Sequence, residues 1–252
     1  MMDNVSKSHS ILTGVNLFVV ILIICCLNYL SSCEKTGVDP QFSYLSIDIK
    51  HSVDGVNIQY DPYLFVNEAG NSYSITDLKY YLSNISLEAE NGETHYDNGI
   101  YYVDIRKDHT LRILLDSIKP GKYTKLTFDL GIDSTRNLTG YLPNTLDNLN
   151  MAWPVPMGGG YHFLKLEGKF LNGSTPYGFA FHLGKSMMII HYSLVLDKKL
   201  AYWNEKLTLK HNISEWFKVP LTYDFLIHEP YSMNSDSVMQ VITYNGADVF
   251  SL

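Results

Sequence analysis

The sequence predicts an all-β protein, a single β-sandwich domain with one or two short helices. Three observations support this fold class. Apolar and polar residues alternate over many short segments, which is the period of a half-buried strand. Residues typical of turns separate these segments at short intervals. The chain also has 19 tyrosines and 11 phenylalanines, and aromatic side chains pack well on a pleated surface.

The segments with this period, taken in order, predict the strands. They are residues 42–49, 80–87, 100–105, 111–115, 123–130, 161–170, 177–183, 187–196 and 207–211. Turns are expected at residues 53–56 and 119–121, which contain Asp-Gly and Pro-Gly. Residues 74–78 are expected to form a single capped turn. Helical spacing of apolar residues predicts a short helical turn at 213–217 and a helix at 235–244.

The N-terminal segment is typical of a bacterial export signal. Lys7 precedes a largely apolar run over residues 15–30, which leads into Leu-Ser-Ser-Cys33, a sequence that resembles a lipobox. We therefore expect residues 1–32 to be a signal peptide and Cys33 to carry the lipid. An uncleaved membrane anchor is the alternative for the same segment. Both place the remaining chain in the bacterial cell envelope, at the periplasmic face or the cell surface.

The remaining chain divides into a short polar tether, residues 33–40, and one domain, residues 41–252. Cys25 and Cys26 lie within the signal, so Cys33 is the only cysteine left after cleavage. We therefore expect neither a disulfide nor a thiolate metal site. A domain of this length buries a core large enough to be stable without them.

Composition and motifs argue against two functional classes. The formal net charge is −7 and the chain has no basic cluster, so we expect no nucleic-acid partner. It contains no Gly-x-Ser-x-Gly elbow, no glycine-rich phosphate loop and no His-Glu-x-x-His motif. We therefore expect that the protein is not an enzyme. A catalytic triad assembled from distant residues is the enzymatic alternative.

The stretch MAWPVPMGGG, residues 151–160, fits no regular element because prolines interrupt helices and glycines weaken strands. It places Met151 and Met157 beside Trp153, and thioethers together with imidazoles favour copper over zinc or calcium. No two histidines have the close spacing of a metal motif, so a site must combine distant strands. The histidines outside the signal are His51, His95, His109, His162, His182, His191, His211 and His228. The alternative is a loop that closes one end of the sandwich with adaptable apolar residues.

Several short motifs occur in an order that resembles the MbnP-like copper-binding proteins, which are secreted or lipid-anchored. They are Met151-Ala-Trp153, then Gly-Tyr-His-Phe-Leu-Lys-Leu-Glu-Gly at 160–168, then Phe181-His182-Leu-Gly184. Residues 42–55, 78–85, 128–133 and 245–250 agree with the same family pattern. Each motif is weak by itself, but the order is fairly specific and extends from residue 42 to the end of the chain.

The resemblance implies a β-sandwich that binds one copper ion through histidines. Carried over position by position, it implies His51 and His182 as the ligands. Trp153 matches a tryptophan of the family, and in relatives a tryptophan is oxidised to kynurenine by a partner dihaem peroxidase of the MauG type. Met151 and Met157 are candidates for the metal shell.

Tyr161 and Glu167 are candidates for orienting a ligand from outside the metal shell. The chain departs from the family pattern in one respect. Many members have Met-x-Trp-x-Trp, whereas here Val155 stands in the place of the second tryptophan and the loop is longer.

Two functions follow as alternatives. The first is a lipid-anchored copper-binding protein that acts in uptake, storage or handover of the metal. The second is a surface lipoprotein whose sandwich binds glycan or protein without metal, with tyrosines as stacking platforms. Convergence of His51 and His182 at the end where residues 151–161 lie would favour copper, whereas their placement at opposite ends would favour the module that binds glycan or protein.

Overall fold

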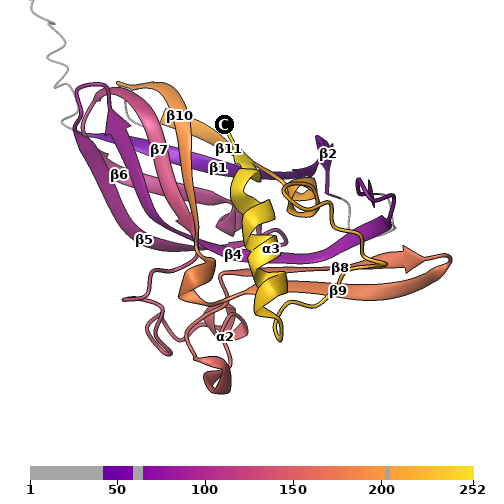
Figure 1. Cartoon of the computed structure of the whole chain (residues 1–252). Coiled ribbons are helices and arrows are strands. Elements are labelled where there is room, and N and C mark those ends of the chain that lie inside the picture. The colour runs from indigo at the N-terminus through magenta and orange to yellow at the C-terminus, as the bar shows by residue number, and fades with distance from the viewer. Residues whose placement is uncertain (1–41, 59–64, 202–204) are drawn as a thin grey trace, which may run out of the picture. The chain divides into compact units, whose positions relative to one another are not determined.

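The computed structural model describes residues 42–58, 65–201 and 205–252 (Figure 1). The expected signal peptide, the lipid-carrying Cys33 and the tether lie outside the described residues. Within the described part, no helix is both long and apolar enough to cross a bilayer.

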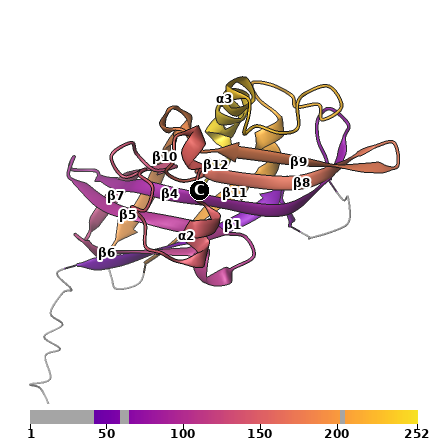
Figure 2. The same cartoon turned by 90° about the horizontal axis from the view of Figure 1, so that it is seen from below.

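Two sheets pack against each other and confirm the predicted all-β sandwich (Figures 1 and 2). The smaller sheet contains β12 (Phe250–Ser251), β11 (Glu205–Asn212), β1 (Ser43–Val53) and β2 (Val56–Asn57), and β6 (Arg112–Ile118) also pairs with β1. Strands β1 and β11 are parallel, whereas the other pairs of this sheet are antiparallel.

The larger sheet is wholly antiparallel and is built around one long strand, β4 (Ser72–Ala89). Its order is β10 (Ile190–Leu200), β7 (Gly121–Leu130), β4, β8 (Leu164–Asn172) and β9 (Thr175–Leu183). The strands β3 (Phe65–Val66) and β5 (Thr94–Asp104) pair with β4 as well.

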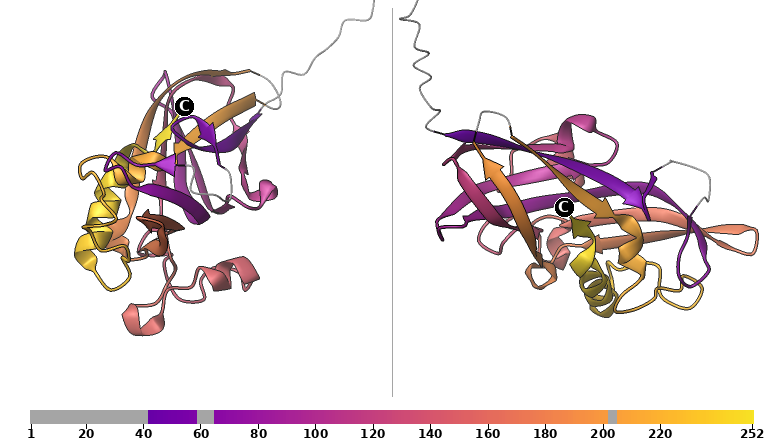
Figure 3. Two further views of the ribbon diagram at one scale, coloured as in Figure 1. Left: turned by 90° about the vertical axis from the view of Figure 1, so that its right-hand side faces the viewer. Right: turned by 90° about the horizontal axis from the view of Figure 1, so that it is seen from above.

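Strand β4 changes its partner midway, and this change positions the loop that follows β7. Tyr80 pairs with Leu164 at the start of β8, and Leu82 pairs with Leu130 at the end of β7. The segment that connects β7 to β8 therefore begins beside Leu82 of β4 and ends beside Tyr80, two residues away on the same strand. Residues 131–163, which we call the β7–β8 loop, contain α2 (Leu146–Asn150) and the 3₁₀ turn η2 (Val155–Met157). The loop projects away from the sheets (Figure 3, left).

Most predicted strands are confirmed, but several details of the prediction are wrong. The strand expected at 187–196 begins at Ile190, because residues 186–188 form a 3₁₀ turn. Residues 74–78 belong to β4 and are not a turn, because they pair with β8 across an irregularity between Ile75 and Asp77. The strand expected at 161–170 begins at Leu164, because residues before it pair with the loop. Helix α2 was not predicted.

The C-terminal helical predictions agree better with the structure. Helix α3 (Asp236–Asn245) is capped by Ser235, whose side chain accepts a hydrogen bond from the Val238 backbone N–H at 3.3 Å. The short turn at 213–217 is the 3₁₀ helix η4 (Ile213–Phe217). The remaining 3₁₀ turns are η1 (Asp108–Thr110), η3 (Ser186–Met188) and η5 (Gly246–Asp248).

Aromatic rings join the two sheets and pack the core. Tyr80 of β4 contacts Phe250 of β12 at a centroid distance of 5.9 Å, and Phe128 of β7 contacts the same ring at 5.3 Å. Phe225 stacks on Phe179 at 4.8 Å. Burial of rings of this size contributes much of the hydrophobic stabilisation in a domain without disulfides.

Candidate metal site

Residues 151–162 fold back on themselves as a short hairpin at the base of the β7–β8 loop. The Trp153 N–H donates to the Gly160 carbonyl at 2.9 Å, and the His162 N–H donates to the Met151 carbonyl at 2.7 Å. The Pro-containing turn η2 lies between the two arms. The irregular sequence of this stretch therefore brings Trp153 and His162 side by side, with ring centroids 4.7 Å apart.

The three glycines at 158–160 have positive φ angles of 114°, 69° and 84°, which L-residues rarely adopt. They also allow close contact with the preceding part of the loop. The Gly160 N–H donates to the Thr139 hydroxyl at 2.9 Å, and a Cβ atom on Gly160 would lie 2.4 Å from the Asn137 side-chain oxygen. The glycines therefore permit close contact between this stretch and the preceding part of the loop.

Trp153 is 2% exposed and packs against the backbone at Gly184. A Cβ atom on Gly184 would lie 2.1 Å from the indole ring, so only glycine leaves room for the ring at this position. The indole N–H donates to the Met157 carbonyl at 3.1 Å. Trp153 thus closes the loop over the outer face of β8 and β9.

His162 and His182 form a pair beneath Trp153. Their ring centroids are 5.1 Å apart and the rings are perpendicular. His162 Nδ1 lies 3.1 Å from the Met151 carbonyl oxygen, and His182 Nε2 lies 2.8 Å from Glu167 Oε1. A carbonyl and a carboxylate only accept hydrogen bonds, so these two nitrogens carry the protons in the neutral rings.

The two other nitrogens of the pair, His162 Nε2 and His182 Nδ1, therefore carry lone pairs. Both atoms are buried, and neither has a hydrogen-bond partner among the described residues. An outer N–H held by a carbonyl or carboxylate and an inner lone pair is the arrangement of histidines that bind metals. The pair can supply two imidazole ligands.

Burial keeps His162 neutral and able to bind a cation. It lowers the pKa of His162 to about 4, and the neighbouring His182 acts in the same direction. The hydrogen bond from His182 lowers the pKa of Glu167, so that carboxylate is ionised near neutral pH. Lys165 Nζ lies 3.8 Å from Glu167 and balances its charge.

His51 lies elsewhere, on the inner side of the larger sheet. Its Nε2 is 2.8 Å from the Tyr80 hydroxyl, and its ring centroid is 5.2 Å from that of His211. His182 shares a rung of the sheet with Lys165 and Lys79, and Lys79 precedes Tyr80 in β4. Because successive residues of a strand point to opposite faces, His51 and His182 lie on opposite sides of this sheet.

The expected pairing of His51 with His182 is therefore corrected: the structure places His162, and not His51, beside His182. Sequence reasoning included His162 in a family motif but gave it no role. The feature of the sequence that could have indicated His162 as a ligand is its position between Tyr161 and Phe163, directly after the irregular stretch at 151–160. The pairing depends on the hairpin at 151–162, which no local pattern shows.

The other candidate residues have distinct positions. Met151 is fully buried and Met157 is partly buried against the core. The Tyr161 hydroxyl accepts a hydrogen bond from the Leu142 N–H at 2.9 Å, so it holds the β7–β8 loop, whereas Glu167 does orient His182. Among the described residues, no group of three His, Cys, Asp or Glu side chains is placed to hold a metal ion.

By its fold and its candidate site, the protein is an all-β sandwich with a buried pair of histidines beneath a loop that carries a tryptophan. The chain belongs to the MbnP family, whose family model matches residues 42–239. A solved structure of MbnP from Methylosinus trichosporium is 12% identical, with 70% of this chain and 78% of that chain covered and a TM-score of 0.48. No curated protein matches the sequence.

Proposed function

We propose that this protein binds one copper ion through His162 Nε2 and His182 Nδ1, for uptake, storage or handover of the metal. The observation that supports this function is the pair of buried, unpartnered nitrogens on adjacent imidazole rings. Leaving such groups unpaired is costly, and a bound cation would satisfy both. Membership of the MbnP family agrees with this proposal.

The chemistry of the site favours copper over the common divalent ions. Zinc sites use three or four protein ligands, and calcium requires six or more oxygens. The described part of the chain offers two imidazoles here and no third His, Cys, Asp or Glu positioned with them. Imidazoles complemented by a thioether or a carbonyl suit copper, and buried Met151 precedes Trp153 by two residues.

The remaining parts of this function rest on the sequence. The protein would contribute no bond-making chemistry of its own and would be held at the cell envelope by a lipid on Cys33. Trp153 touches His162, so it is the residue that a MauG-type dihaem peroxidase would oxidise if the chain has such a partner.

The experiment is elemental analysis of the purified mature chain after loading with Cu(I) and removal of excess metal. We expect one copper per chain in the parent and none bound stoichiometrically by His162→Ala or His182→Ala. The control is His191→Ala, whose side chain is 76% exposed and which should keep the copper. Circular dichroism of each variant shows whether it is folded.

Two outcomes would contradict the proposal. Copper retained by both folded variants would exclude the pair as the ligands. Copper lost from a folded His51→Ala variant but retained by His162→Ala would restore the pairing that the sequence suggested.

A further inference from the structure

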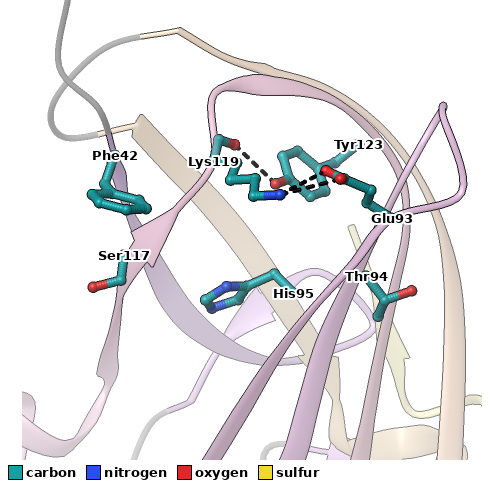
Figure 4. A pocket seen from close by; sticks show the side chains of 7 residues that line it. All are labelled: Phe42, Glu93, Thr94, His95, Ser117, Lys119 and Tyr123. Carbon is teal, nitrogen blue, oxygen red and sulfur yellow. Dashed lines mark hydrogen bonds and ion pairs between the residues drawn. The ribbon is translucent and has the colours of Figure 1, made fainter.

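A separate hollow lies at the other end of β7 from the histidine pair. It has a volume of about 310 Å³ and is lined by residues of β5, β6 and β7 and by Phe42 (Figure 4). Tyr123 of β7 and Lys119 of the turn between β6 and β7 form one wall. Since β7 is 10 residues long, the hollow and the β7–β8 loop are about 30 Å apart at 3.3 Å per residue.

Aromatic rings form part of the lining of this hollow. Phe42 is 45% exposed, so its ring is available to a ligand, whereas the Tyr123 ring is buried in the wall. Figure 4 shows the His95 ring projecting from β5 toward the side where Phe42 and Ser117 lie. The face of an aromatic ring carries negative potential and attracts weakly positive C–H groups.

Polar groups of the hollow supply donors and acceptors without net charge. Glu93 and Lys119 form an ion pair at 3.1 Å, and the Tyr123 hydroxyl donates to the Lys119 carbonyl at 2.9 Å. No interaction joins His95 to the other residues drawn in Figure 4. Burial lowers the pKa of His95, so the neutral ring offers one donor and one acceptor.

We propose that this hollow binds a single uncharged pyranose ring, as a free sugar or at the end of a glycan. Hydroxyl groups both donate and accept, which matches a neutral imidazole beside a paired Glu93 and Lys119. The C–H face of the sugar packs on Phe42. A volume of about 310 Å³ is at the small end of ligand pockets and suits one ring.

The test is a titration of the ¹⁵N-labelled mature chain with methyl glycosides of glucose, galactose and N-acetylglucosamine, followed by two-dimensional NMR. Up to about 50 mM sugar detects millimolar affinity. We expect shifts confined to the amides of residues 42, 93–95 and 117–123 for at least one of these sugars. Glucuronate and glucosamine, which are charged, should bind at least tenfold more weakly.

Substitutions of residues that line the hollow test whether the sugar binds there. Phe42→Ala and His95→Ala should weaken it at least tenfold, whereas Tyr96→Ala should not change it, because Tyr96 is 72% exposed and does not line the hollow. Binding should be the same in the His182→Ala variant, since the hollow is distinct from the histidine pair. Absence of shifts with every neutral sugar, or equal binding by Phe42→Ala, would overturn the proposal.

Discussion

At the scale of single residues, the decisive feature is which ring nitrogen of each histidine carries the proton. Met151 and Glu167 accept the outer N–H groups, and this leaves the other ring nitrogens, His162 Nε2 and His182 Nδ1, with lone pairs. A backbone carbonyl is fixed by the hairpin, but the Glu167 carboxylate is a side chain and can be removed. Its contribution can therefore be measured separately from the ligands.

Glu167→Met removes the acceptor while keeping a side chain of similar length. We expect the Cu(I) affinity to fall about 10- to 100-fold, because a ligand histidine without its outer hydrogen bond is poorly oriented. Competition with a chelator of known affinity measures the change. Glu88→Met is the matched control, since Glu88 forms an ion pair with Lys125 on the same sheet. Equal affinities in the two variants would show that Glu167 does not position His182.

At the scale of elements, sequence patterns predicted the strands well because the period of two reflects burial of one face. The sequence patterns failed where pairing with a neighbouring strand determines the structure and the local residue types suggest another one. Residues 74–78 have the composition of a capped turn, yet β8 pairs with them and extends β4 to 18 residues. Helix α2 has only five residues, too few for a helical period of apolar residues to be recognised in the sequence.

The candidate site was predicted only in part, for the same physical reason. The loop at 151–160, Trp153, His182 and Glu167 could be singled out from residue types and from the family resemblance. The position of His162 depends on the hairpin at 151–162, which is closed by backbone hydrogen bonds and is joined to an earlier part of the loop where the Tyr161 N–H donates to the Asn137 side chain. Neither the hydrophobic period nor the spacing of motifs in the sequence indicates such contacts.

The contact between the strand end at Gly184 and Trp153 can be tested at this scale. Gly184→Ala would place a methyl group 2.1 Å from the indole. We expect the free energy of unfolding to fall by about 1–3 kcal/mol, because a tightly packed contact of this kind cannot absorb a methyl group. Near-UV circular dichroism should report the displaced indole, and urea denaturation measures the stability.

Gly121→Ala is the control for that variant, because a Cβ atom there would meet only Tyr123, at 3.9 Å. If Gly184→Ala is as stable as Gly121→Ala and its indole signal is unchanged, Trp153 does not lie against Gly184 in solution.

At the scale of the whole molecule, the two sheets enclose a second pair of histidines, His51 and His211. Burial lowers the pKa of His51 from 6.5 to about 4. It also lowers the pKa of His211, whose Nε2 accepts a hydrogen bond from the Trp216 indole at 2.9 Å. The neighbours of His51 in the core, Tyr80 and His211, carry no negative charge that would stabilise a protonated ring.

Because His51 and His211 are buried as a pair, we expect the folded protein to lose stability in mild acid. The unfolded chain binds the His51 proton more tightly than the folded chain, so the free energy of unfolding falls as the pH decreases from 6.5 towards 4. We expect His51 to account for roughly 2–3 kcal/mol of that fall. Urea denaturation of the metal-free protein between these pH values measures it. His51→Gln should be less sensitive to pH, and equal pH dependence of the two proteins would contradict the prediction.

The most direct test of the central claim is X-ray absorption at the copper edge, on the Cu(I)-loaded parent and on His162→Ala. We predict scattering from two imidazole rings in the parent. His162→Ala should hold no stoichiometric copper, and any residual copper should show scattering from at most one imidazole ring. Two imidazoles in both proteins, or none in the parent, would show that copper is not bound between His162 and His182.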